Sequence, residues 1–288
     1  MTKITPMVFG FLICCTIVHA QQNSLPAKWI ALFNGKDLSG WDIKITGSPL
    51  NDNYKNTFRV NQGILSVNYD QYGKFQGEYG HIYFKKPFAY YLLHVEYRFI
   101  GDQLVGGETW NVRNSGVMIH SQSAASMGLD QNFPVSLEIQ FLGGLGKGKR
   151  STANLCTPGT VVEVDGKKFT DHILESSSKT YDGDQWVTID AIVLGDSLIR
   201  HFVNGEEVLS YRKPQIGGGF VGGANDWKWG KVKNAEEWIQ KDGTPLQRGY
   251  IALQAESHPI EFRKVELLDL ETVPDWKKLN LNSLFLKP

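Results

Sequence analysis

Short segments in which apolar and polar residues alternate recur along most of this chain, and they constrain its fold more than any other feature. Residues 137–141 are the clearest example: the odd-numbered residues are apolar and fall on one face of a strand, while Glu138 and Gln140 fall on the other. Similar strand-like segments occur at residues 91–99, 115–120, 186–194, 198–203, 249–255 and 260–268.

Turn signals separate these segments. Asp165-Gly166 and Asn204-Gly205 are typical of tight hairpins, in which both central residues have positive φ. The chain contains 30 glycines and 12% aromatic residues, and only residues 234–240 show a helical pattern. We therefore expect an all-β protein in which two antiparallel sheets pack as a sandwich.

Residues 1–20 have the pattern of a secretory signal peptide. Lys3 precedes an apolar run at residues 7–18, and Ala20 is a small residue suited to cleavage. The run is too short to serve as a membrane-spanning anchor. We expect cleavage after Ala20 and export to the periplasm or the extracellular space, with lipid attachment at Cys14 or Cys15 as the alternative. Residues 21–288 would then form a single domain.

The charge balance argues against two classes of partner. Lys and Arg number 30, as do Asp and Glu, so the formal net charge is zero. Such a chain has no electrostatic bias towards nucleic acid or an anionic membrane surface. Cleavage after Ala20 would leave Cys156 as the only cysteine, so the fold would be held by its core without an internal disulfide.

A second strand near the carboxyl end repeats the pattern of residues 137–141. Within residues 251–256 the apolar residues alternate with Gln254 and Glu256. A carboxylate beside a carboxamide, projected from two strands, suits binding and acid–base chemistry on a hydroxyl-rich ligand such as a small-molecule or oligosaccharide glycoside. The alternative is that these side chains form the solvated faces of ordinary antiparallel strands.

An ordered series of motifs resembles the 3-keto-disaccharide hydrolase family. The series covers most of the chain after residue 28 and consists of residues 29–41 (WIALFNGKDLSGW), 95–99 (VEYRF), 114–117 (NSGV), 137–140 (LEIQ), 203–205 (VNG), 251–254 (IALQ) and 260–267 (IEFRKVEL). The resemblance implies a concanavalin-like jelly-roll sandwich whose concave sheet carries the ligand site. It also implies activity on glycosides in which the sugar is already oxidised to a ketone at C3.

Such a substrate would need a particular set of groups. A ketone at C3 acidifies the proton on C2, so one base can form an enolate, and β-elimination then expels the aglycone from C1 before water adds back. The site would need a base near C2, donors to the enolate oxygen and an acid at the leaving oxygen. It would not need the opposed carboxylates of an ordinary glycosidase.

Three residues are candidates for catalysis. Glu138 is the first choice for the base or the acid, because the centre of a strand aims it rigidly; its alternative role is a carboxylate paired with Arg98. Arg98 could donate to an enolate oxygen or merely neutralise Glu138. His120 could shuttle a proton or bind a metal, although an isolated histidine at a strand end is often structural.

Further residues are expected to bind the substrate. They offer hydrogen-bonding groups along the strands or aromatic surfaces beside a glycine-rich loop, and they are Asn114, Ser115, Gln140, Gln254, Glu256, His258, Trp227 and Trp229. The chain has no metal-ligand signature such as His-Glu-x-x-His, so no cofactor is assigned, and a divalent metal stays open.

Two other functional classes fit the same sequence. A conventional glycoside hydrolase on this fold usually carries two catalytic carboxylates a few residues apart on one strand, whereas this chain has Glu138 followed by Gln140. A non-catalytic carbohydrate-binding module would use aromatic surfaces and hydrogen bonds without needing a titrating carboxylate.

Overall fold

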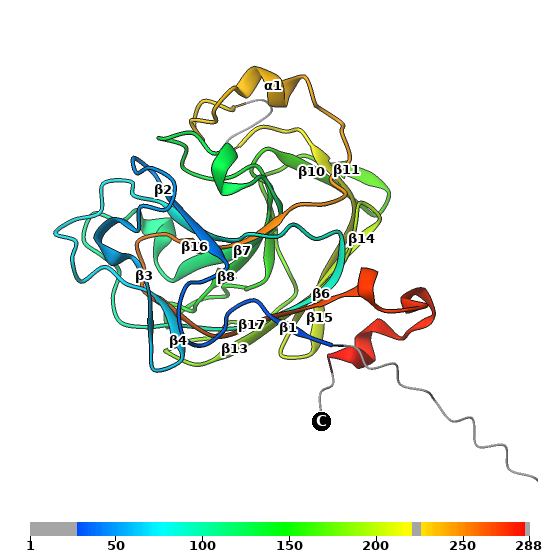
Figure 1. Ribbon diagram of the computed structural model, residues 1–288, viewed down its shortest axis with the longest axis horizontal. Coiled ribbons are helices and arrows are strands. Elements are labelled where there is room, and N and C mark those ends of the chain that lie inside the picture. Colours follow the sequence, from blue (N-terminus) through cyan, green and yellow to red (C-terminus); the bar gives the residue numbers. More distant parts are fainter. Residues whose placement is uncertain (1–27, 221–225, 286–288) are drawn as a thin grey trace, which may run out of the picture.

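The computed structural model describes residues 28–220 and 226–285. The expected signal peptide at residues 1–20 lies outside the described residues. Two antiparallel sheets stack face to face, as Figure 1 shows. The prediction of an all-β sandwich is confirmed.

The seven-stranded sheet carries most of the residues singled out above. Its strands lie in the order β12 (Ile173–Leu174), β9 (Asn154–Cys156), β8 (Leu137–Leu142), β7 (Asn114–Ser121), β16 (Tyr250–Ala255), β5 (Gly80–Phe84) and β2 (Trp41–Ile45). The strands that contain Glu138 and Gln254 are therefore separated by β7 alone.

The second sheet is larger. Its path is β11 (Lys167–Phe169), β10 (Thr160–Val164), β15 (Glu206–Ile216), β14 (Leu198–Val203), β13 (Val187–Leu194), β6 (Tyr90–Phe99), β17 (Ile260–Asp269), β4 (Ile64–Val67) and β3 (Phe58–Asn61), and β1 (Ile30–Ala31) pairs with β17.

Helical structure is sparse in the described part of the chain. The α-helix α1 (Ala235–Ile239) lies at one end of the sandwich, close to the predicted helical stretch. The 3₁₀ turns are η1 (Tyr54–Asn56), η2 (Thr109–Asn111), η3 (Ala124–Ser126), η4 (Leu270–Thr272), η5 (Trp276–Lys278) and η6 (Leu281–Leu284). No helix within the described ranges is long and apolar enough to cross a bilayer.

The hairpin turns follow the residues that favour them. Asp165 and Gly166 have φ of 50° and 76° and join β10 to β11 in a two-residue loop. Asn204 and Gly205 have φ of 49° and 85° and join β14 to β15 in the same way. Both pairs therefore match the twist of their strands, as the sequence predicts.

The seven-stranded sheet is buried on both faces. The apolar residues Leu137, Ile139 and Phe141 of β8 point into the core between the sheets. A second apolar cluster, which includes Phe133, Phe220 and other loop residues, lies outside that core. Loops therefore cover part of the outer face, from which Glu138 and Gln140 project, and this face is not simply solvated.

The ten-stranded sheet is covered in another way. Leu92, Ile192 and Phe202 point out of the sandwich, opposite to the core-facing residues of their strands, and form a cluster with Leu268 and Leu270. The carboxyl-terminal segment with η4, η5 and η6 packs onto this cluster, and Figure 1 shows it in red outside the sheet. The segment thus shields apolar surface that would otherwise face water.

This packing predicts a position-dependent cost for removing a leucine side chain. Leu270→Ala should lower the free energy of unfolding by about 2–5 kcal/mol, because the Leu270 side chain is fully buried against the outer cluster. Leu129→Ala is the matched control, because Leu129 is 55% exposed, and it should change stability by less than about 0.5 kcal/mol. Urea denaturation followed by circular dichroism measures both, and equal losses would contradict the packing role of the segment.

Candidate active site

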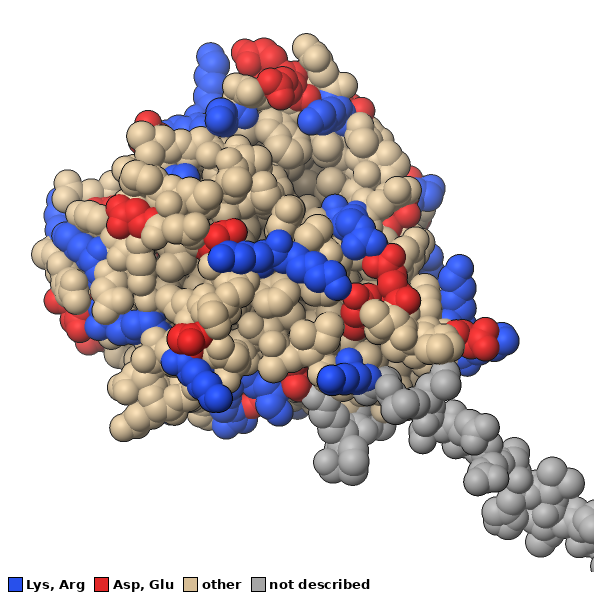
Figure 2. All heavy atoms as spheres, viewed as in Figure 1, with Lys and Arg blue, Asp and Glu red and all other residues tan. Residues whose placement is uncertain are grey.

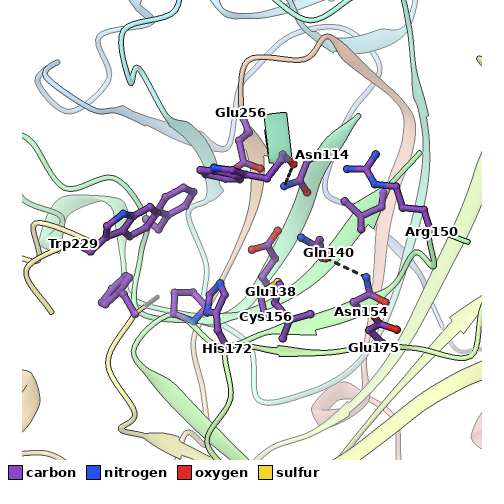
Figure 3. A pocket seen from close by; sticks show the side chains of 16 residues that line it. Asn114, Glu138, Gln140, Arg150, Asn154, Cys156, His172, Glu175, Trp229 and Glu256 are labelled. Carbon is purple, nitrogen blue, oxygen red and sulfur yellow. Dashed lines mark hydrogen bonds between the residues drawn. The ribbon is translucent and has the colours of Figure 1, made fainter. Parts of the chain in front are cut away.

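A cavity of about 470 Å³ opens on the outer face of the seven-stranded sheet. Its walls include both polar and aromatic side chains, and Figure 3 shows them around an open centre. The lining residues are Trp110, Asn114, Phe133, Glu138, Gln140, Leu142, Arg150, Asn154, Cys156, Pro158, His172, Ile173, Glu175, Phe220, Trp229 and Glu256.

Glu138 lies on the floor of the cavity because β8 alternates. Its side chain extends over Gly116 of the neighbouring strand β7, where an added Cβ atom would collide with Glu138 Oε1. The φ of Gly116 is not in the left-handed region, so space rather than backbone conformation requires glycine here. Gly116, part of the Asn-Ser-Gly motif, therefore provides the room in which the Glu138 carboxyl lies.

Glu256 brings a second carboxyl group to the same cavity. It directly follows β16, and the next residue, Ser257, has φ of 72° in the turn towards β17. The Glu256 side chain is buried, and its Oε2 atom has no hydrogen-bond partner among the described residues. A carboxyl group in this position is poorly solvated and unpaired.

The two carboxyl groups influence each other's ionisation. Burial raises the pKa of Glu256 well above its usual range, and the nearby Glu138 carboxylate raises it further. Burial likewise raises the pKa of Glu138. Because charging either group discourages charging the other, the pair retains a proton near neutral pH.

Amide groups extend the polar floor from Glu138 towards β9. Gln140 Oε1 accepts a hydrogen bond of 3.1 Å from Asn154 Nδ2. Asn154 is held in turn by bonds with Ser151 and with the backbone N–H of Ser176. The Gln140 NH₂ group is thereby left as a donor at the edge of the cavity, where it could bind a hydroxyl group.

Arg150 and Asn114 form another side of the cavity. Arg150 Nη1 donates to the carbonyl oxygen of Gly143 at 2.7 Å, which fixes the guanidinium group, and no described carboxylate forms an ion pair with it. Asn114 Nδ2 donates to the carbonyl oxygen of Trp110, while Asn114 Oδ1 is buried without a partner among the described residues. Figure 3 shows the Arg150 guanidinium extending towards Asn114. Arg150 thus brings free donors to this side of the cavity, whereas the Asn114 Oδ1 atom is enclosed by protein.

His172 and Cys156 are uncharged members of the site. Burial lowers the pKa of His172, so its imidazole is neutral at pH 7. Cys156 lies opposite Glu138 in the β8–β9 register. Burial, with the neighbouring carboxylates, raises the pKa of the Cys156 thiol well above its usual range. The thiol is therefore protonated and is not an activated nucleophile.

Aromatic side chains form the remaining wall. Trp229 stacks on Phe133 with ring centroids 5.4 Å apart and planes 5° from parallel. Trp110 stacks on Tyr79 at 6.1 Å and 12°. The two indoles are 43% (Trp110) and 36% (Trp229) exposed, so both are rigidly backed but open to the cavity mouth.

The structure corrects the placement of Arg98. We expected it to share a face with Glu138, but Arg98 belongs to β6 in the other sheet. Alternation along β6 turns it to the outside of the sandwich, where its guanidinium bonds to Glu261 at 2.6 Å and stacks on Trp186. The expectation that Arg98 shares a face with Glu138 is wrong, because two polar strand faces can lie on opposite sides of a sandwich.

His120 does not line the cavity either, although it lies on the same strand as Asn114. A register shift between β16 and β7, together with φ of 48° at His120, marks a bulge that breaks the alternation. His120 is buried and donates through Nε2 to the carbonyl oxygen of Gly195 at 3.0 Å. Burial lowers its pKa to about 4, which is consistent with a structural, neutral imidazole.

Four expected binding residues also lie outside the cavity lining. The Ser115 hydroxyl donates to the carbonyl oxygen of Gln254 within the sheet. Gln254 points to the outer face but is almost fully buried beside its register partner His81. His258 follows the reversed φ at Ser257, which ends the alternation from Glu256, and it packs edge-on against Phe99. Trp227 packs against Phe220 and is 3% exposed.

The cavity therefore gathers Glu138, Gln140, Asn114, Glu256 and Trp229 from the expected set. It also contains residues that are not in the expected set, and they are Arg150, Asn154, Glu175, His172 and Trp110. The backbone bonds that fix Arg150 have no local sequence signal, whereas the exposed indole of Trp110 belongs to a residue type that commonly binds sugars.

The surface of the protein carries charged side chains of both signs. Figure 2 shows Lys and Arg interspersed with Asp and Glu over one face of the molecule. In the described part of the chain, no three His, Cys, Asp or Glu side chains come together as metal ligands. The cavity thus offers a carboxyl pair, amides, one arginine and aromatic rings as its functional groups.

Comparison with known proteins assigns the chain to a family. Residues 28–268 match the family model described as a 3-keto-alpha-glucoside-1,2-lyase-like domain. The chain belongs to this family. The two-sheet sandwich is the fold that the sequence resemblance implied, and family membership supports a carbohydrate-active enzyme with sugar ligands.

Solved structures with a similar fold were also found. One is a Parabacteroides distasonis protein provisionally described as a glycosyl hydrolase, with 20% identity over 85% of this chain and 95% of that chain and a TM-score of 0.49. Another is a carbohydrate binding module from Bacillus subtilis, with 8% identity, coverage of 78% and 93%, and a TM-score of 0.41. No protein of curated function matches this chain significantly.

The buried carboxyl pair predicts an unusual pH dependence of stability. The raised pKa means that folded Glu256 keeps a proton that the unfolded chain releases above about pH 4.5. The free energy of unfolding should therefore fall as the pH rises above that value, with a slope of up to about 1.4 kcal/mol per pH unit for one proton. Glu256→Gln removes the titrating group and should flatten this fall.

Urea denaturation at pH 5, 6, 7 and 8 measures the effect. Glu206→Gln is the matched control, because Glu206 is exposed at the start of β15. Its curve should run parallel to that of the wild type. A Glu256→Gln curve that is also parallel to the wild type would show that the Glu256 carboxyl is not protonated in the folded protein.

Proposed function

We propose that this protein is an exported enzyme that cleaves 3-keto-glycosides by C2 deprotonation, β-elimination and hydration. The observation that carries the proposal is the pair of buried carboxyl groups, Glu138 and Glu256, which share a cavity and together retain a proton. One member can take a proton while the other gives one, which is what an elimination next to a ketone requires. Family membership supports the same substrate class.

In the proposed reaction, ionised Glu138 removes the proton on C2. The electron pair of the C2–H bond forms the enolate of the C3 ketone, and its return breaks the bond between C1 and the leaving oxygen. Protonated Glu256 gives its proton to that oxygen, which departs as an alcohol. Water then adds across the C1–C2 double bond, with a proton returning to C2 and hydroxide to C1.

Arg150 takes the role first considered for Arg98. Its guanidinium is anchored by Gly143, lines the cavity and has no described carboxylate partner. It is therefore available to donate to the developing enolate oxygen. The Gln140 amide would bind a remaining sugar hydroxyl.

A non-catalytic carbohydrate-binding protein is the second candidate function. The exposed indoles of Trp110 and Trp229 at the cavity mouth favour it, because aromatic surfaces suffice for sugar binding. A buried carboxyl pair is costly and unnecessary in a simple binding site, and this cost favours the enzyme.

Export is supported by the apolar run at residues 7–18, which is followed by Ala20. Amino-terminal sequencing of the protein exported by its host should give Gln21. A start at Cys14 or Cys15 carrying a lipid would contradict this part of the proposal.

The first functional prediction concerns substrate and base. The protein should cleave a 3-keto-glucoside and leave the parent glucoside intact, because only the ketone acidifies C2. Glu138→Gln keeps the shape of the side chain but removes the base, and it should lower kcat by about 10²–10⁴. Chromatography of the released sugar measures both effects.

Two further readouts make this prediction discriminating. In deuterated water the C2 proton should exchange during turnover, as mass spectrometry of the product would show. Glu261→Gln serves as the control, because Glu261 lies on the other sheet beside Arg98. Equal cleavage of the unoxidised glucoside would instead support a conventional glycoside hydrolase, and binding without cleavage would support a binding module.

The second functional prediction separates the two arginines. Arg150→Lys should lower kcat by about 10²-fold, because an ammonium group cannot reproduce the anchored guanidinium and its remaining donors. Arg98→Lys is the matched control and should change the rate by less than about twofold, since Arg98 lies outside the sandwich. A larger loss with Arg98→Lys than with Arg150→Lys would rule out this assignment.

A further inference from the structure

The cavity is divided into two chemically different halves. The polar floor consists of Glu138 and Gln140 on β8 and Asn154 on β9, and further polar side chains enter from outside the strands, namely Arg150, His172, Glu175 and Glu256. The aromatic side chains come from loops outside the sheet, and they are Trp110, Phe133, Phe220 and Trp229. A ligand that fills the cavity therefore meets a polar floor and several aromatic faces from the loops.

The aromatic half is built to expose rigid ring faces. Trp229 is backed by Phe133 and Trp110 by Tyr79, in nearly parallel stacks. The two indoles meet at 6.4 Å with their planes inclined by 51°, which forms an angled corner rather than a closed stack. Each ring is thus fixed from behind and keeps surface available to a ligand.

The hydrogen-bonding capacity of this half is low. Phe133, Phe220 and Pro158 have no polar side-chain atoms, and each indole offers a single N–H donor. A second sugar ring stacked on these surfaces would find few side-chain partners for its hydroxyl groups. A flat apolar ring would lose nothing comparable and would gain stacking contacts.

We propose that the aglycone half of the cavity takes an aromatic alcohol, so that the substrate class is the 3-keto-glucosides of phenols rather than of a second sugar. This inference rests on the proposed function and specifies its substrate. The oxidised sugar lies on the polar floor, and the phenol ring lies in the corner between Trp110 and Trp229. When the C1–O bond breaks, the phenol oxygen leaves with the electron pair and takes up the proton from the carboxyl pair.

The test must measure binding affinity rather than cleavage rate, because a phenol is a better leaving group than a sugar and would be released faster in any case. Calorimetric titration of the inactive Glu138→Gln variant with 3-keto-glucosides of phenol, methanol and glucose, in both anomers, does so. The phenyl compound should bind about tenfold more tightly than the other two. Equal affinity, or tighter binding of the glucosyl compound, would overturn the proposal.

Substitutions at the two tryptophans test whether they cause the preference for the phenyl compound. Trp229→Ala and Trp110→Ala, each combined with Glu138→Gln, should remove the phenyl preference and leave the affinity for the methyl compound nearly unchanged. Trp229→Phe and Trp110→Phe preserve a ring and should retain most of the preference, which guards against misfolding of the alanine variants. Loss of affinity for all three compounds alike would show that the indoles hold the sugar instead.

Free phenol distinguishes failure of this inference from failure of the proposed function. Quenching of indole fluorescence by phenol in the wild-type protein should saturate, and Trp229→Ala should weaken it. If no 3-keto-glucoside is cleaved but phenol still binds, the proposed reaction is wrong and the aromatic site stands. If cleavage occurs without a phenyl preference and phenol does not bind, the reaction stands and this inference is wrong.

Discussion

The site depends on one constraint, the burial of both faces of the seven-stranded sheet. One face packs into the core of the sandwich, while loops and their aromatic residues cover much of the other. Because side chains alternate along β8, every second residue points away from the core and into the space between the sheet and the covering loops. Polar residues at those positions lose water, and this loss is the main cause of the raised pKa of both Glu138 and Glu256.

The same constraint produces a polar row across the sheet. The β-sheet register places Lys44 opposite His81, His81 opposite Gln254, and Gln140 opposite Asn154. Lys44 is satisfied by three backbone carbonyl groups. His81 and Gln254 Oε1 have no partners among the described residues, and each unsatisfied buried group costs about 1–3 kcal/mol. Unsatisfied polar atoms thus occur on the sheet face that carries the cavity. Such departures from a fully satisfied interior are common at functional sites.

Much of the fold could be predicted because it follows from local rules. Hairpins at Asp165-Gly166 and Asn204-Gly205 and the two faces of β8 need only turn chemistry and a period of two. The placement of Arg98 could not be derived in this way, because alternation assigns a face within a strand but not the sheet or the side to which that face belongs.

Irregular backbone limited the prediction of the site more than unusual residue types did. His120 and His258 both fit the alternation on paper, and both are displaced where the backbone enters the left-handed region, at His120 itself and at Ser257. Arg150 is the opposite case. It lies outside any strand, and hydrogen bonds to the carbonyl oxygens of Gly143, just after β8, and Arg113, just before β7, hold it in the cavity. Its position beside Asn114 could therefore not be predicted from the sequence.

Gly116 and the carboxyl pair together bear on the choice between reaction types. Gly116 lets Glu138 lie flat on the sheet, in a position where no described cation pairs with its carboxylate. A conventional retaining glycosidase needs an ionised carboxylate as its nucleophile or stabiliser, and a buried pair that resists ionisation is poorly suited to that role. A carboxylate with a raised pKa is, however, a stronger base once it is ionised. The proposed elimination would use this property, because its base has to remove a carbon-bound proton.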